Sequence, residues 1–328
     1  MLNLTDRQIS SLLDFRAVAA ILEDAYADLA HDRAAMHPRQ RTDCAGVRLS
    51  TMGAVWTARG VAGVKVYPTV AGQFSFAVLL FDLETNAPLA LLDGNELTRF
   101  RTAAITLLAA TRMARPASSK LALFGAGVQG RSQAMALIER FSFHEIDVVD
   151  PAASERWCDD LQAASGARVR ISTPEAAVRD ADIVVTATRS PTPVFDGDWL
   201  APGAFVSAVG TSTARNRELD DRTLARASRV VVEWAPQSIG EAGEIVLWNE
   251  GRDVTKIVDL PALYRGERAW AAASDRDITV QVRRRRPGRR RRGRARDRAR
   301  ARRRGARMSP HGRPKGESTE ARSAEVAL

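Results

Sequence analysis

The chain has 328 residues and a formal net charge of +10, a length sufficient for about two domains with cores of their own. No apolar run approaches the roughly 20 residues of a membrane span, and the N-terminus lacks the basic and apolar regions of a secretion signal, so we expect a cytoplasmic protein. With 2 cysteines and 4 scattered histidines, the sequence contains no pattern typical of a disulfide or a metal site.

The positive charge is confined to one end of the chain. Residues 281–328 carry 19 basic and 4 acidic residues, a net charge of +15. The preceding 280 residues carry 30 basic and 35 acidic residues, a net charge of −5. The charge of the whole chain therefore says nothing about the partners of its folded part.

The first 116 residues are predicted to form helices and a sheet. Apolar residues recur at helical spacing over residues 5–31, and a second helix is expected over 97–112. Turns such as Asn86-Ala-Pro88 join the strands as hairpins, which favours an antiparallel or mixed sheet. The expected strands are 47–52, 63–67, 74–81 and 89–92.

From Leu121 onward strands and helices alternate, which is typical of a doubly wound parallel sheet of the Rossmann type. The fold class expected for the whole chain is therefore α/β, with a central Rossmann sheet beside an α+β domain. The expected strands are 121–124, 146–149, 168–171, 182–186, 204–209 and 229–233, and the expected helices are 130–140, 152–164, 174–178 and 220–226.

A glycine motif follows the first of these strands directly. Gly125 permits a sharp turn, Gly127 lets a pyrophosphate approach the backbone, and Gly130 lets the next helix pack close to the strand. The free N–H groups at the start of that helix hold phosphates. Strand, glycine turn and helix in this order predict a dinucleotide-binding loop.

Other residues extend the predicted cofactor site. Asp150 ends the second strand, where an acid commonly bonds the ribose hydroxyls; its presence instead of an arginine favours NAD, with NADP as the alternative. Thr186 and Thr188 lie at a carboxyl strand end, where open α/β sheets bind ligands. The predicted cofactor-binding residues here are Gly125, Gly127, Val128, Gln129, Gly130, Asp150, Thr186, Thr188 and Val209.

The composition changes abruptly after Val280. Residues 283–313 contain 17 arginines among Gly, Ala and Pro, and such a segment cannot bury enough apolar surface to offset its ordering entropy, so we expect disorder. A nucleic-acid-binding arm is a second interpretation, disfavoured because no aromatic residues are interleaved for base stacking. A third hypothesis is a frameshifted C-terminus, since a GC-rich gene read out of frame encodes Arg/Gly/Pro/Ala-rich sequence.

The globular part resembles the ornithine cyclodeaminase/μ-crystallin family over roughly residues 5–280. The likeness is carried by Gly63-Val-Lys65, the block Asp93–Ala104 with Arg101-Thr102, Gly125–Gly130, Ala208-Val-Gly210, Arg217-Glu218-Leu219 and Gly243-Glu244-Ile245. The resemblance implies a substrate-binding and dimerisation domain made from both chain ends, and a central domain that binds NAD(P).

The domains expected from this resemblance follow the chain. They are 1–116 for substrate and dimerisation, 117–260 for the Rossmann domain, 261–280 as a segment returning towards the first domain, and 281–328 as a disordered basic tail. The family's last segment is normally helical, so the arginine-rich tail is a departure from its pattern.

The resemblance also implies small α-amino acids and their imines as substrates. Arg101 is expected to bind the substrate carboxylate bidentately, with either Arg39 or Arg41 as a second clamp. Lys65 is expected to act as general acid or base at the substrate nitrogen, because the pKa of lysine shifts readily on burial. Thr102 is expected to bond a cofactor phosphate.

Two departures bear on the reaction. Cyclodeaminases carry an aspartate where this chain has Thr211-Ser212, and a second acid where it has Ser50. The hydroxyl of Ser212 can bond substrate or water but is a poor base at neutral pH.

The sequence therefore favours an NAD(P)-dependent oxidoreductase that moves hydride between the nicotinamide and the α-carbon of a small amino or imino acid, such as a cyclic ketimine or alanine. The alternatives are an ornithine cyclodeaminase that uses NAD catalytically, and a non-catalytic protein that binds NAD(P) or another small ligand. A homodimer is expected, with neither nucleic acid nor membrane as a partner.

Overall fold

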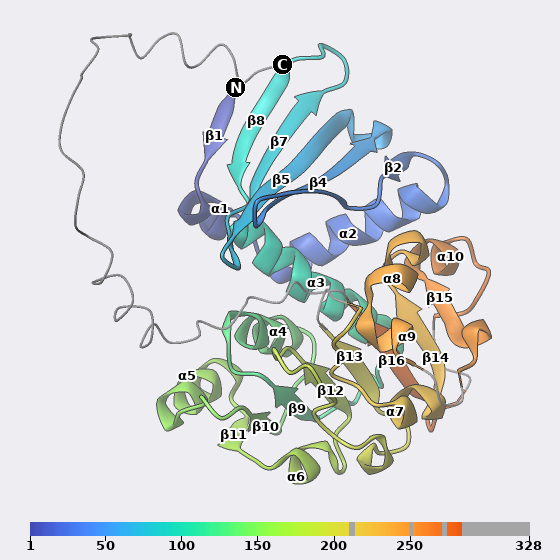
Figure 1. Ribbon diagram of the computed structural model, residues 1–328. Helices are drawn as coiled ribbons and strands as arrows, with labels where there is room; N and C mark the ends of the chain where they lie inside the picture. Colours follow the sequence, from blue (N-terminus) through green and yellow to red (C-terminus); the bar gives the residue numbers. More distant parts are fainter. Residues whose placement is uncertain (210–213, 249–251, 271–273, 284–328) are drawn as a thin grey trace, which may run out of the picture. The chain divides into compact units, whose positions relative to one another are not determined.

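The structure is a computed structural model that describes residues 1–209, 214–248, 252–270 and 274–283 (Figure 1). Two sheets, each of eight strands, make up this part of the chain. Among the described residues, none of the helices combines the length and apolar character that crossing a bilayer requires.

The N-terminal sheet is mixed, as predicted. Its order is β1-β8-β7-β5-β4-β2, with β3 on β4 and β6 on β5; only the β1–β8 pair is parallel. The strands are β1 (Leu2–Leu4), β2 (Ala34–Met36), β3 (Gln40–Cys44), β4 (Val47–Trp56), β5 (Val61–Val70), β6 (Gln73–Phe74), β7 (Ala77–Asp82) and β8 (Pro88–Asp93).

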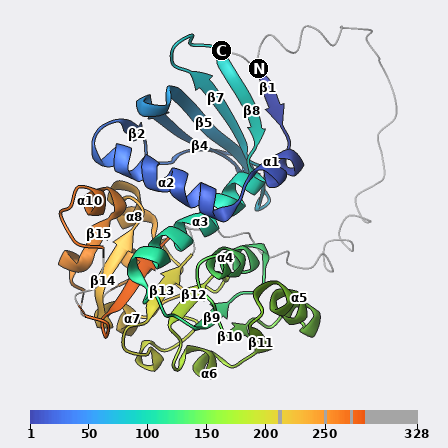
Figure 2. The ribbon, with the colours of Figure 1, turned by 180° about the vertical axis from the view of Figure 1, so that it is seen from behind.

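Three α-helices accompany this sheet: α1 (Asp6–Leu12), α2 (Phe15–Ala30) and α3 (Asn95–Met113), with the short η1 (Thr57–Arg59). The first two are separate because Asp14 caps α2, its carboxylate accepting the N–H of Ala17. Both views show α3 between the two sheets (Figures 1 and 2), and it contacts α2 on one side and α4, β13 and β16 on the other. Helix α3 therefore carries side chains into the junction between the sheets.

The second sheet is parallel throughout, which confirms the predicted doubly wound fold. Its order is β11-β10-β9-β12-β13-β16-β14-β15. The strands are β9 (Lys120–Phe124), β10 (Glu145–Val149), β11 (Arg168–Ile171), β12 (Ile183–Thr186), β13 (Phe205–Ala208), β14 (Ala227–Val232), β15 (Ile257–Asp259) and β16 (Ile278–Val282). The helices are α4 (Val128–Ile138), α5 (Glu155–Ser165), α6 (Pro174–Val178), η2 (Gly197–Trp199), α7 (Asp221–Arg226), α8 (Ala235–Glu241), α9 (Gly243–Val246), η3 (Val254–Lys256) and α10 (Leu260–Tyr264).

Apolar cores lie on both faces of this second sheet. In β9, Leu121 and Leu123 belong to one core, whereas Ala122 and Phe124 belong to the other. Burial on both faces explains why strands such as β9 and β12 are nearly continuous apolar runs in the sequence.

The strand order reverses between β9 and β12, because β10 and β11 lie on one side of β9 and β13 continues beyond β12. Such a reversal leaves a crevice outside the carboxyl ends of the two strands. The glycine motif at 125–130 follows β9 directly and so lies at this crevice.

The C-terminal boundaries differ from those expected. Helix α10 contacts α2, in line with a return towards the first domain, but β16 lies inside the second sheet between β13 and β14. Strand β16 includes Gln281 and Val282, and Arg283 is buried, so the folded part extends beyond the expected boundary at 281. The rest of the predicted disordered tail lies outside the described residues.

Candidate functional site

A pocket of about 580 Å³ lies at the junction of the two sheets. The N-terminal sheet, helix α3, and the glycine loop with the start of α4 each contribute residues to its lining. Its lining includes Arg39, Lys65, Tyr67, Phe76, Glu96, Thr98, Arg99, Arg101, Thr102, Val128, Gln129 and Arg189.

Lys65 projects from the centre of β5 into this pocket. Its Nζ donates to the hydroxyl of Thr98 on α3 and lies 4.0 Å from the ring centroid of Phe76. Burial, followed by the nearby charges of Arg101 and Arg39, lowers the pKa of Lys65 to about 6. A lysine with this pKa exchanges a proton readily near neutral pH.

The candidate carboxylate-binding arginines separate into two groups. Arg101 and Arg39 both line the pocket. Arg101 forms an ion pair with Glu233 at 4.0 Å, and Nη2 of Arg39 lies 3.6 Å from the sulfur of Met52. Arg41 does not line it, because β3 directs its side chain to Glu241, whose carboxylate it meets at 2.7 Å. The geometry therefore favours Arg39 over Arg41 as the second clamp.

The glycine loop has the shape that a dinucleotide needs. Gly125 has a φ of +102°, which glycine adopts without strain, and a Cβ there would lie 2.7 Å from the carbonyl oxygen of Ala187. A Cβ at Gly130 would lie 1.7 Å from the carbonyl oxygen of Gly125, so only glycine lets α4 pack this close. Space is open at Gly127, where a Cβ would have no described atom within 4 Å beyond the adjacent chain. The residues present fit a pyrophosphate.

The neighbours of this loop hold it in place. The carboxylate of Asp150 accepts the N–H groups of Ala126 and Ala152, both at 2.7 Å, at the end of β10. Gln129 has a buried side-chain oxygen without a hydrogen-bond partner among the described residues, and it lines the pocket. Thr102 is buried, and its carbonyl oxygen accepts from Gln133 of α4 at 3.3 Å. Helix α3 is thus bonded directly to the dinucleotide-binding helix.

The remaining predicted cofactor residues differ in how deeply they are buried. Thr188 is half-buried at the crevice, and both its N–H and its hydroxyl donate to Glu218. Thr186 and Val209 differ from the expectation of direct contact, because both side chains are almost completely buried in the sheet. Ser212 lies outside the described residues.

Sequence reasoning missed several residues of the pocket. Thr98 precedes Thr102 by one helical turn, and Tyr67 follows Lys65 by two residues on the same face of a strand, so spacing alone could have indicated both. Phe76 could not be found this way, because it lies in a break between β6 and β7. Ser50 is fully buried, and its hydroxyl has no hydrogen-bond partner among the described residues.

No group of three or more His, Cys, Asp or Glu side chains is arranged to hold a metal ion in the described part of the chain. The pocket brings together a lysine with a lowered pKa, two arginines and a loop shaped for a dinucleotide.

Comparisons with known proteins identify chains of similar sequence and fold. The mouse protein "Ketimine reductase mu-crystallin" is 35% identical over 189 residues, which span 57% of this chain and only 58% of the mouse protein. A structure described as a probable ornithine cyclodeaminase from Bordetella pertussis Tohama I superposes with a TM-score of 0.83 at 44% identity, covering 88% of this chain and 92% of that one. The Δ1-pyrroline-2-carboxylate reductase of Thermococcus litoralis, solved with NADH and L-proline, gives a TM-score of 0.79 at 25% identity over 86% of this chain and 91% of that one.

Residues 2–281 match the sequence profile of the family, which confirms the resemblance inferred from the motifs. This chain belongs to the ornithine cyclodeaminase/mu-crystallin family.

Proposed function

We propose that the protein is an NAD(P)-dependent oxidoreductase that interconverts a small imino acid and the corresponding amino acid. The observation that carries the proposal is the pocket itself, in which Lys65, Arg39 and Arg101 face the glycine loop through Val128 and Gln129. A proton donor, carboxylate-binding groups and a pyrophosphate-shaped loop lie at one place.

The glycine loop and the start of α4 would hold the cofactor, and Asp150 would accept hydrogen bonds from the adenosine ribose, which favours NAD over NADP. When bound, the nicotinamide supplies or accepts the hydride. The protein's own contribution is to orient the substrate, to shield it from water and to move a proton.

The substrate carboxylate would bind between Arg101 and Arg39, because arginine forms strong bidentate bonds with carboxylates. This places the substrate nitrogen towards Lys65. In the reductive direction Lys65 donates its proton to the imine nitrogen as hydride reaches the α-carbon; in the oxidative direction the neutral amine accepts a proton from the substrate. Tyr67 and Phe76 form an apolar wall beside the amine.

The charge of the pocket disfavours a diamino acid such as ornithine. Among the described lining residues the only acid is Glu96, and its carboxylate is bound to Arg99 at 2.5 Å and 2.9 Å. A second amino group would lack a carboxylate partner, whereas a cyclic imino acid needs none. This supports the reductase over the cyclodeaminase.

Two assays on the full-length protein test the proposal. With NADH and Δ1-pyrroline-2-carboxylate, we expect loss of NADH absorbance and formation of proline. With ornithine and NAD, we expect no ammonia. Ammonia release without net NADH formation would instead establish the cyclodeaminase, and NADH binding with no turnover of either compound would favour a non-catalytic binding protein.

The matched variants Arg39→Lys and Arg41→Lys test the carboxylate clamp. Both keep a positive charge, but only Arg39 lines the pocket. Losing a charge-assisted bond costs about 1.5–3 kcal/mol, so we expect Arg39→Lys to raise the KM for the imino acid by roughly tenfold or more. Arg41→Lys should leave that KM unchanged, and the affinity for NADH should be the same in both. Equal effects of the two variants would contradict the assignment.

We also propose that the protein is a homodimer formed through the N-terminal sheet. The face of that sheet opposite Lys65 exposes the apolar side chains Val47, Leu49, Val55, Val70, Leu89 and Leu91. Exposed apolar patches of this kind mark association surfaces. The cytoplasmic location remains a prediction from the sequence.

A further inference from the structure

Two glutamates that carry part of the family likeness, Glu218 and Glu244, have no role in the site described above. Both are fully buried beside the carboxyl end of β12. A buried carboxylate is costly unless it is fully hydrogen-bonded, so a pair of them in one place calls for an explanation.

Glu218 organises the segment that leaves β12. Its Oε2 accepts the hydroxyl of Thr186 at 3.0 Å, and its Oε1 accepts both the N–H and the hydroxyl of Thr188 at 2.5 Å. All three groups are donors, which favours the ionised form of Glu218. The side chain of Glu218 thus holds both Thr186, the last residue of β12, and Thr188 in the segment that follows.

The segment held by Glu218 is a wall of the dinucleotide crevice. The carbonyl oxygen of Ala187 and the N–H nitrogen of Thr188 lie 2.7 Å and 3.3 Å from the position that a Cβ of Gly125 would take. The next residue, Arg189, lines the pocket. Any shift of Thr188 would therefore change the packing against the glycine loop.

The side chain of Glu244 contacts the backbone of Glu218. Its Oε1 accepts the backbone N–H of Glu218 at 3.1 Å, and its Oε2 is buried without a hydrogen-bond partner among the described residues. Burial and the charge of Glu218 raise the pKa of Glu244 to about 8, against a smaller opposing effect of Arg217. Arg217 is itself paired with Asp221. Burial and the neighbouring carboxylate therefore favour the protonated form of Glu244.

We propose that Glu218 and Glu244 form a buried pair in which Glu244 stays protonated, and that this proton keeps the segment Ala187–Arg189 in the position that binds the cofactor. The proposal rests on the proposed function, because it assumes that a dinucleotide occupies the crevice. Both glutamates are positioning residues rather than catalytic ones.

Loss of the proton would add a second negative charge in a dry environment, on the carboxylate that accepts the N–H of Glu218. Like charges at such a site repel strongly, and water entry or movement of Glu218 would relieve the repulsion. Either change weakens the bonds to Thr188. The added negative charge also opposes the approach of a pyrophosphate.

The test is the affinity for NADH, measured on the full-length protein by fluorescence titration at about pH 7 and about pH 9. If binding requires the proton, the Kd of the wild type for NADH should rise about tenfold from pH 7 to pH 9, because these values lie about one unit below and above the pKa of Glu244. Glu244→Gln keeps an oxygen for the N–H of Glu218 and cannot ionise, so its Kd should stay constant. The titration of Lys65, at about 6, lies below this window.

Glu218→Ala and Thr186→Val separate the contact to Thr188 from general packing. Glu218→Ala removes all three acceptor bonds and should weaken NADH binding by tenfold or more at pH 7. Thr186→Val removes one donor in the sheet interior and leaves the two bonds to Thr188, so its Kd should change by less than about threefold. If Glu218→Ala does not fold, the Glu244→Gln pH comparison still decides the question.

A merely structural pair would give a different result. The melting temperature of the wild type would then fall as pH rises while the Kd for NADH stayed constant, and that outcome overturns the proposal. A protein that binds NADH at neither pH contradicts the proposed function itself, whereas pH-independent binding contradicts only this inference.

Discussion

At the scale of single residues, the Lys65 amine links structure to reactivity most directly. Its pKa of about 6 arises mainly from burial and then from Arg101 and Arg39, so the amine of the free enzyme is largely neutral at pH 7. The ratio kcat/KM reports the protonation state of the free enzyme. Oxidation of the amino acid needs neutral Lys65 and should therefore gain in kcat/KM as pH rises through about 6, whereas imine reduction needs the ammonium form and should lose over the same window.

Changing one neighbouring charge should move this transition in a known direction. Arg39→Met removes a repelling cation, so the midpoint of the kcat/KM profile should shift upward even though the KM for the imino acid also rises. The control is Arg41→Met, which lies outside the pocket and should leave the midpoint in place. A midpoint that is the same in all three proteins would show that another group controls the profile.

The same scale shows what the sequence could and could not predict. The positions of Lys65 and Arg101 at the pocket, and the tight turn at Gly125, follow from motifs whose chemistry depends on residue type. The choice between Arg39 and Arg41 did not follow, because Arg41 is drawn to Glu241, which is 200 residues away in the chain. Thr186 was expected to bind the cofactor at a carboxyl strand end, but it is buried and bonded to Glu218, which is 32 residues away in the chain.

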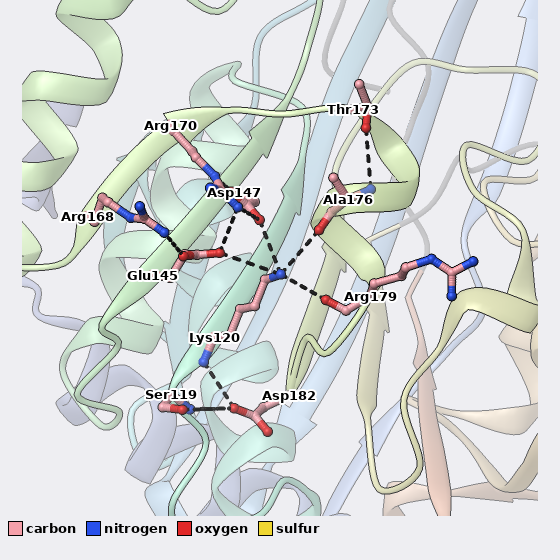
Figure 3. A network of polar contacts seen from close by, with 10 residues as sticks. All are labelled: Ser119, Lys120, Glu145, Asp147, Arg168, Arg170, Thr173, Ala176, Arg179 and Asp182. Carbon is pink, nitrogen blue, oxygen red and sulfur yellow. Dashed lines mark hydrogen bonds and ion pairs between the residues drawn. The ribbon is translucent and has the colours of Figure 1, made fainter.

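At the scale of elements, strands β9, β10 and β11 are joined by a ladder of charges (Figure 3). Nζ of Lys120 lies 3.4 Å from the carboxylate of Asp147 and 3.5 Å from that of Glu145, and it donates to the carbonyl oxygens of Ala176 and Arg179 at the end of α6. Arg170 of β11 binds Asp147 from the other side. The ladder ties α6 to three strands, at the end of the sheet opposite the glycine loop.

We expect Lys120→Met to lower the free energy of unfolding by about 1–3 kcal/mol, because it leaves the fully buried Asp147 with one cation fewer and two carbonyls without their donor. Urea denaturation measures this change. The control Arg179→Met removes a pair whose side chains are 57% and 51% exposed, which costs about 0.5 kcal/mol or less. NADH affinity should be unchanged in both, since Lys120 and Gly125 are separated by the length of β9, roughly 16 Å. An equal cost for the two variants would contradict a structural role for the ladder.

The six strands expected between Leu121 and Glu233 all exist. Most of them are apolar runs buried on both faces, whereas β11, with the sequence Arg-Val-Arg-Ile, is mostly exposed. Strand β3 was missed: its five residues are all exposed, and it is a strand only because it pairs with β4. The expected strand at 74–81 is broken before β7, where Phe76 packs against Lys65.

At the scale of the whole molecule, the exposed face of the N-terminal sheet is the surface through which we propose that two copies associate. The row Gly53, Val64, Leu79 and Leu91 runs across four paired strands, and strand alternation places Leu49 and Val55 on the same face. The neighbouring row contains Met52 and Lys65 and points to the pocket. One sheet therefore has the proposed substrate pocket on one face and an apolar surface on the other.

A charge placed on this apolar surface should separate the two copies without closing the pocket. In light scattering, we expect the wild-type protein to have twice the chain mass of 35.8 kDa. The double variant Leu49→Asp/Leu91→Asp should have the mass of one chain, because burying two carboxylates in an apolar interface costs more free energy than forming the interface gains. Val254→Asp alters an apolar side chain that is 60% exposed in the other half of the protein, and it should remain dimeric. If the double variant still forms dimers, the contact lies elsewhere. If it is monomeric yet binds NADH with wild-type affinity, the crevice is complete within one chain.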